Sequence, residues 1–259
     1  MTDASRAAHT SARLPLEPAS ADFPYYAGVP VMISRRGWLV VLAGVAAGFA
    51  ALDVRAPVED NIISGWLRVA AFVGLPLLAL AYAAPRAWTA IFRRVGPRQV
   101  LQMLAFGLAN IVISMAVGAV VKTFGTVSAN GEIAGAGQLE GLHLAAFFAK
   151  IAPQLLGEEL LTILPLLAIM RFCTARGISR NRAALIAWIA SAVLFGLLHL
   201  PTYGWNLVQC VVVIGSARLV LSWAYVWSKN IWVSTGAHIF NDWTLIASTI
   251  FLAPLAGHA

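Results

Sequence analysis

Five acidic or histidine side chains lie inside long apolar stretches of this 259-residue chain. Glu158 and Glu159 stand in the sequence LLGEELLTILP, His199 in LFGLLHLP, and His238 with Asp242 in STGAHIFNDW. Titratable groups in an apolar environment are costly unless they are paired, so within membrane segments they mark functional sites. Carboxylates and imidazoles take up and release protons, and this set therefore predicts acid–base chemistry at a buried site.

The spacing of these residues predicts which of them can act together. His238 and Asp242 are four residues apart, so a helix places both on one face. Adjacent residues on a helix point about 100° apart, so Glu158 and Glu159 must face different partners. We expect one glutamate to face a catalytic partner and the other a structural cation. Three helices can thus direct polar groups into one interior cavity.

Each of these groups also has a plain structural interpretation. The glutamates can form an ion pair with Arg218, and His199 can be an interfacial histidine at a helix end. His238 and Asp242 can form a hydrogen bond between packed helices. Their joint occurrence on three separate apolar segments, with little else ionisable there, favours a functional site over packing alone.

The composition indicates that lipid surrounds these segments. Hydrophobic residues make up 60% of the chain and charged residues 11%, and the mean hydropathy is +0.79. A soluble domain carries about a quarter charged residues, so a single soluble globule is excluded. The 18 Lys and Arg residues are scattered between apolar segments, so the net charge of +7 does not indicate a nucleic-acid partner. Cys173 and Cys210 lack CxxC spacing and are expected to be inert packing residues.

Apolar runs of about 20 residues predict an all-α fold, a polytopic transmembrane helical bundle. We expect seven spans, with eight as the alternative, at 37–54, 62–84, 100–121, 151–172, 183–200, 205–227 and 231–254. The apolar run 142–149 allows the fourth span to begin earlier. Segment 86–96 predicts an interfacial amphipathic helix, and 123–140 a polar loop.

The chain is thereby divided into four parts: a disordered tail at 1–34, N-terminal transmembrane helices at 35–122, a polar loop and approach to span four at 123–148, and a helical core at 149–256. Arginines concentrate in the loops after spans two and four. The positive-inside rule then places the N-terminus in the cytoplasm and, with seven spans, the C-terminus outside. We expect a multi-pass protein of a bacterial plasma (inner) membrane.

The ordered motifs Glu-Glu, Phe-x-x-x-His and His-x-x-x-Asp or Asn, each on its own apolar helix, resemble the CPBP family of intramembrane proteases. This family includes CaaX prenyl proteases and bacteriocin-processing enzymes and is also called the ABI family. The motifs map onto Glu158 and Glu159, onto Phe195 and His199, and onto His238 and Asp242. The similar region covers 149–248, so the part at 149–256 is expected to be a CPBP-like catalytic core.

One position departs from the family's first motif, Glu-Glu-x-x-x-Arg. This chain has Ile163 where the family has an arginine that is expected to neutralise or orient the glutamates one turn along the same helix. Another cation must then do so, or the pair must hold a proton. Our hypothesis is that Arg218, isolated in span six, supplies the cation.

The resemblance implies hydrolysis of a peptide bond at or within the membrane. Glu158, oriented with His199, would deprotonate a water that attacks the scissile carbonyl, while His238 and Asp242 would hold or polarise the oxyanion. With Glu159, these residues form the candidate catalytic set. A metal-free water is the favoured form, and a divalent metal such as zinc, held by His199, His238 and Glu158, stays open. The implied partners are membrane lipid and a membrane-associated protein or peptide, which in CaaX substrates is prenylated.

Two further function classes stay open. One is a proton-coupled transporter in which the glutamates and histidines form a proton relay, and the other is a catalytically silent membrane scaffold. The chain lacks the HExxH, GxSG and GxGD motifs typical of other intramembrane proteases. The order of the three motifs and the absence of an internal repeat favour the CPBP-type protease over the transporter.

Overall fold

The computed structural model describes residues 13–14, 17, 21–53 and 61–251, and among these residues it contains helices and no strand. A helix occupies each of the seven predicted span positions. These helices are α2 (Arg35–Asp53), α3 (Ile62–Ala83), α4 (Pro97–Phe124), α6 (Gly141–Thr174), α7 (Arg180–Leu198), α8 (Gly215–Ser228) and α9 (Ile231–Phe251). The expected all-α helical membrane bundle is confirmed. The predicted last turn of span seven, at 252–254, lies outside the described residues.

Five of the described helical segments are long and apolar enough to cross a membrane: α2, α3, α4, α7 and the continuous helix Gln209–Ser228, which includes α8. The chain is therefore an integral membrane protein. The other two long helices, α6 and α9, carry the two glutamates and the His238–Asp242 pair. Four of the five predicted site residues thus lie on these two helices, and His199 follows the end of α7.

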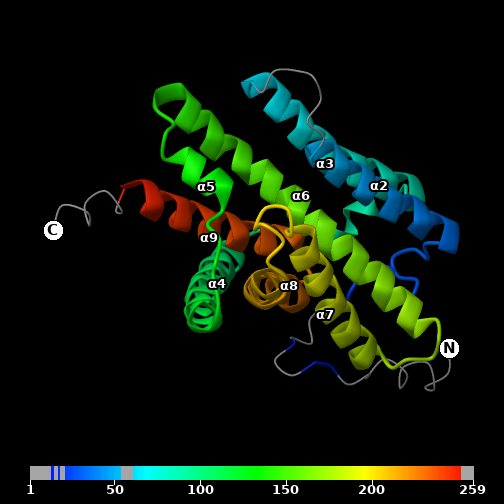
Figure 1. The fold of residues 1–259 in the computed structure, drawn as a ribbon. Helices are drawn as coiled ribbons and strands as arrows, with labels where there is room; N and C mark the ends of the chain where they lie inside the picture. The colour runs from blue at the N-terminus through cyan, green and yellow to red at the C-terminus, as the bar shows by residue number, and fades with distance from the viewer. Residues whose placement is uncertain (1–12, 15–16, 18–20, 54–60, 252–259) are drawn as a thin grey trace, which may run out of the picture.

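Helix α6 runs through the middle of the bundle (Figure 1). Helices α2 and α3 pack on one side of it, and α7, α8 and α9 contact it on the other, with α4 packed outside α8 and α9. Its 34 residues begin at Gly141, so the early start allowed for span four is confirmed. At about 1.5 Å per residue, such a helix is roughly 50 Å long and exceeds a hydrocarbon core of about 30 Å.

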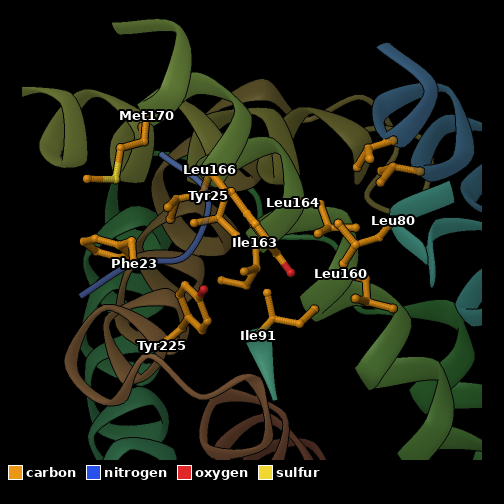
Figure 2. Close-up of a cluster of buried hydrophobic side chains, with 14 of the residues drawn as sticks. Phe23, Tyr25, Leu80, Ile91, Leu160, Ile163, Leu164, Leu166, Met170 and Tyr225 are labelled. Atoms are coloured by element: carbon orange, nitrogen blue, oxygen red, sulfur yellow. The ribbon is translucent and has the colours of Figure 1, made fainter. Parts of the chain in front are cut away.

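The hydrophobic core is built around α6 (Figure 2). Leu160, Ile163 and Leu164, in the turn that follows the glutamates, are fully buried, and they meet Tyr25 of the N-terminal segment and Tyr225 of α8 in the same cluster. Burial of a large apolar side chain stabilises the fold by about 1.5–3 kcal/mol. This cluster therefore fixes the position of α6 directly beside Glu158 and Glu159.

Two glycines allow the helices to approach closely around the site. A Cβ atom at Gly157 of α6 would collide with the ring of Phe72 on α3, and one at Gly196 of α7 would collide with the backbone carbonyl of Cys210. Cys210 lies in a short π-helix, η2 (Gln209–Ile214), which leads directly into α8. Cys210 and Cys173 are both free and buried, in agreement with a packing role.

The N-terminal segment differs from the predicted disordered tail where the structure describes it. Phe23, Tyr25 and Ile33 are buried in the main core. Glu17 is almost fully buried and forms ion pairs with Arg180 at 2.5 Å and with Lys229 at 2.5 Å. The prediction was wrong here because it relied on the lack of periodicity, whereas buried aromatic residues on an irregular backbone carry no period. Residues 1–12, 15–16 and 18–20 of the predicted tail lie outside the described residues.

Two connecting segments also differ from the prediction. The expected amphipathic helix at 86–96 is only a four-residue 3-10 helix, η1 (Trp88–Ile91). Its Ile91 is fully buried, and the following backbone is held by the side chain of Asn230, so protein contacts rather than a lipid interface determine its conformation. The expected loop at 123–140 contains a short helix, α5 (Gly131–Ala136). Ala136 packs with Ile151 and Leu155 of α6, which a reading of loop composition does not foresee.

Candidate active site

A buried ion pair between α6 and α8 lies at the centre of the candidate site. The Arg218 guanidinium donates to Oε1 of Glu159, and both side chains are completely inaccessible to solvent. The guanidinium also lies 4.7 Å from the ring centroid of Phe195 on α7, a cation–π distance. Arg218 of α8 is therefore the cation beside the glutamate pair. The hypothesis drawn from Ile163, which stands where the first motif has an arginine, is confirmed in this respect.

His238 of α9 extends this ion pair into a chain of three groups. Its Nδ1 lies 3.0 Å from Oε1 of Glu159. A carboxylate can only accept, so Nδ1 carries a proton and donates it. The other ring nitrogen, Nε2, lies 3.8 Å from Oε2 of Glu158 and 3.6 Å from Oδ1 of Asp242. Glu159 thus fixes the ring so that Nε2 faces the two more accessible carboxylates, whose side chains are 16% and 29% exposed.

His199 stands at the C-terminal end of α7. Its Nδ1 lies 2.8 Å from the backbone carbonyl of Phe195, one turn earlier, and the two rings have centroids 4.4 Å apart. Because a carbonyl only accepts, Nδ1 carries the proton and Nε2 of a neutral ring is left as an acceptor. His199 lies within electrostatic range of His238 and Asp242. The Phe-x-x-x-His spacing therefore fixes both the orientation and the tautomer of this imidazole.

Three further polar residues join the site without having been singled out in the sequence. The Asn110 side chain of α4 donates to Oδ1 of Asn241 at 3.0 Å, and Asn241 donates to Oδ1 of Asp242 at 2.8 Å. This pair of amides orients Asp242 from a fourth helix. Tyr203 stacks on His199 and lies within electrostatic range of Asp242 and Glu158. A signal existed for Asn110, since it is a polar residue in the middle of an apolar span.

All five predicted site residues come from separate parts of the sequence to one region of the bundle. Glu158, Glu159, His238 and Asp242 are linked by the distances given above, and His199 joins them through its electrostatic contact with His238. In the described residues, the polar groups of α6, α7 and α9 therefore lie close together, as predicted. Their chemical roles are considered below.

The sequence leaves open a zinc ion held by His199, His238 and Glu158, and this stays a prediction. Within the described residues, no group of three His, Cys, Asp or Glu side chains is arranged to hold a metal ion. Zinc requires at least three ligand atoms around one point. The sequence places ligand types on three helices, but it does not determine whether their donor atoms converge.

These observations first define a class: a polytopic helical membrane protein with a cluster of carboxylates and imidazoles where four helices meet. The family comparison then identifies the region that carries the site. Residues 140–244 match the family model described as type II CAAX prenyl endopeptidase Rce1-like, and they contain all five predicted site residues. The expected resemblance to the CPBP and CAAX protease family is thus confirmed for residues 140–244.

This match supports an intramembrane CAAX-type endopeptidase in general, a kind of hydrolase that acts on membrane-associated peptides. Neither a search of curated proteins nor a search of solved structures gives a significant match to the chain.

Proposed function

We propose that this protein is an intramembrane endopeptidase that hydrolyses a peptide bond of a membrane-associated substrate by means of a glutamate-activated water. The observation that carries the proposal is the chain Arg218–Glu159–His238, which ends with a histidine nitrogen facing Glu158 and Asp242. The Arg218–Glu159 pair and its bond to Nδ1 are sufficient to hold His238 in place. The carboxylates of Glu158 and Asp242 near Nε2 add nothing to that structural role, which favours a chemical one.

Glu158 is the general base in this proposal. It is the more accessible of the two glutamates, and it accepts a proton from the attacking water while the oxygen of that water forms a bond to the scissile carbonyl carbon. Nε2 of His199, left as an acceptor by its bonded Nδ1, holds the second hydrogen of the same water. When the C–N bond breaks, Glu158 returns its proton to the leaving amine, so the protons balance.

His238 stabilises the oxyanion formed in this step. In its protonated form the ring donates Nδ1–H to Glu159 and has a second N–H, at Nε2, directed into the site. Three carboxylate oxygens at 3.0, 3.6 and 3.8 Å favour that positive charge. Asp242, oriented by Asn241, keeps the imidazole of His238 in place. Preorganised donors of this kind are usually the largest single contribution to catalysis.

The substrate class and the membrane are parts of the same proposal. The family's printed description names a CAAX prenyl endopeptidase, which makes a prenylated C-terminal peptide the first substrate to test. The bacteriocin-processing members make an unprenylated membrane peptide the second. A bacterial plasma membrane as the location belongs to this second form of the proposal.

Purified protein reconstituted into proteoliposomes provides the test. We expect hydrolysis of a membrane-anchored peptide by the wild type and a fall in kcat of about 10²–10⁴ in Glu158→Gln, the range of a lost general base. Glu140→Gln changes an exposed glutamate at the start of α6 and serves as the control with unchanged activity. Unchanged turnover in Glu158→Gln, or proton flux that depends on Glu158, would contradict the protease and favour the transporter.

The metal-free form of the mechanism is tested on the same preparation. The donor arrangement described above leads us to expect full activity after dialysis against a strong chelator. Loss of activity that added zinc restores would refute this part of the proposal while leaving the protease intact.

A further inference from the structure

A cavity of about 350 Å³ lies away from the candidate active site, where the connection between α3 and α4 meets the turn between α8 and α9. Its wall includes the polar side chains of Arg93, Arg94, Arg98, Gln99, Gln102 and Asn230. We call it the arginine cavity. Three arginine residues line this one small volume, which makes it a candidate site for an anion, because Arg presents several N–H donors in a planar fork that matches phosphate oxygens.

In the part of the chain that the structure describes, no carboxylate forms an ion pair with the arginines of the arginine cavity. Arg93 donates from its guanidinium to the backbone carbonyl of Asp22 at 3.3 Å, which carries no net charge. Like charges close together repel each other, so binding of an anion in this cavity lowers the electrostatic free energy.

The backbone beneath these arginines is held in place. Asn230 is 2% exposed, accepts from the backbone N–H of Arg93 at 3.1 Å, and donates to the carbonyls of Arg93 and Arg94 at 3.3 Å each. Helix α4 begins immediately afterwards, with Pro97 in its first turn. The positive end of a 28-residue helix therefore points towards the same region, which adds to the attraction for an anion.

The surroundings of the arginine cavity favour a lipid over a free phosphate ion. Directly after Arg98, α4 presents Leu101, Leu104 and Leu108 at its surface, 67%, 43% and 57% exposed. This helix is one of the candidate membrane spans, so its exposed apolar face contacts acyl chains. The basic loop belongs to the predicted cytoplasmic side, where the leaflet carries anionic lipids.

We propose that the arginine cavity binds the phosphate group of an anionic phospholipid, with the acyl chains lying along the exposed apolar face of α4. The inference is independent of the proposed protease activity, because none of the cavity residues belongs to the candidate active site. A free phosphate ion shares the same chemistry, and the experiment below separates the two sources.

The test measures lipid binding to the purified, delipidated full chain by native mass spectrometry. Phosphatidylglycerol and phosphatidylcholine with identical acyl chains are titrated against the wild type and against Arg94→Gln/Arg98→Gln. An arginine near an anionic lipid contributes about fivefold in affinity, so the double variant should bind phosphatidylglycerol roughly 30-fold more weakly and phosphatidylcholine equally well. Arg94→Lys/Arg98→Lys keeps the charge and should retain most of the binding.

The matched control is Arg36→Gln/Arg86→Gln, which removes the same charge from two exposed arginines outside the cavity. It should leave phosphatidylglycerol binding unchanged. An equal loss in this control, or equal affinity of the wild type for the two lipids, would overturn the proposal. Displacement of phosphatidylglycerol by an equimolar amount of inorganic phosphate would overturn the lipid as the ligand and assign the cavity to free phosphate.

Discussion

Replacement of Arg218 by leucine tests whether the buried ion pair between α6 and α8 supports both the fold and the site. The variant leaves Glu159 as a charge in an environment with no solvent access, since both partners are 0% exposed. Loss of one partner from a buried pair costs about 3–5 kcal/mol. For a domain of this size, 1 kcal/mol corresponds to roughly 2–4 °C, so Tm should fall by about 6–20 °C.

The same variant should lower activity through His238 rather than through substrate binding. Without Arg218, the buried negative charge of Glu159 is no longer stabilised, so Glu159 takes up a proton or moves. His238 then loses the carboxylate acceptor that fixes its ring. Arg218 acts as a positioning residue in this account, so kcat should fall while KM stays near its wild-type value. Thermal unfolding in detergent and peptide hydrolysis in proteoliposomes measure the two effects.

A relocated arginine provides the decisive comparison. Ile163 lies one turn after Glu159 on α6, and side chains on a helix point back towards its N-terminus, so an arginine at position 163 can reach the same carboxylate. Arg218→Leu/Ile163→Arg should therefore recover part of the lost kcat, but not the lost Tm, because Ile163 is itself fully buried in the apolar cluster. Arg182→Leu, at an exposed arginine, is the control. A Tm change below about 2 °C in Arg218→Leu, or an equal loss of Tm in Arg182→Leu, would refute the reasoning.

Two further predictions concern the elements around the site. Burial lowers the pKa of Lys229 to about 8, although its ion pair with Glu17 acts in the opposite direction, whereas the unfolded value is near 10.5. From pH 8 to 10 the unfolded chain therefore binds more protons than the folded one. The unfolding free energy of the wild type should then rise relative to that of Lys229→Met, by up to about 1.4 kcal/mol per pH unit. A constant difference in unfolding free energy across this range would contradict the prediction. Gly196→Ala should destabilise the chain by about 1–3 kcal/mol and lower kcat, because the new Cβ would push the end of α7 and His199 away from Cys210. Gly118→Ala, where the nearest side-chain atom would be 3.9 Å away, should be neutral or stabilising, and equal Tm shifts in the two variants would disprove the steric argument.

The residues of the candidate site could be picked out from the sequence because membrane-spanning segments contain few ionisable residues. Glu158, His199 and His238 stand out against apolar neighbours, and the helical period alone pairs His238 with Asp242. The partnership of Arg218 with the glutamates followed from the missing arginine at Ile163. The sequence could not say which glutamate Arg218 would meet, since that depends on the rotation of α6 against α8.

Other features were not predictable, for reasons specific to their residues. Asn110 reaches Asp242 only through Asn241, and a two-step link between α4 and α9 leaves no spacing in the sequence. The burial of Phe23 and Tyr25 depends on contacts with distant helices rather than on a local period. The π-helix at Gln209–Ile214 brings the backbone carbonyl of Cys210 against Gly196, and composition does not encode such a contact.

The placement of the site's cation on α8 rather than on α6 has a consequence for biogenesis. As the chain emerges from the ribosome, α6 enters the membrane with two adjacent glutamates and without the charge that neutralises one of them, because Arg218 is synthesised 59 residues after Glu159. Insertion of a charged group without a partner is unfavourable. Helix α6 should therefore remain beside the translocation machinery until α8 has been synthesised, and the two helices should enter the lipid together. The ion pair thus couples the insertion of α6 to that of α8.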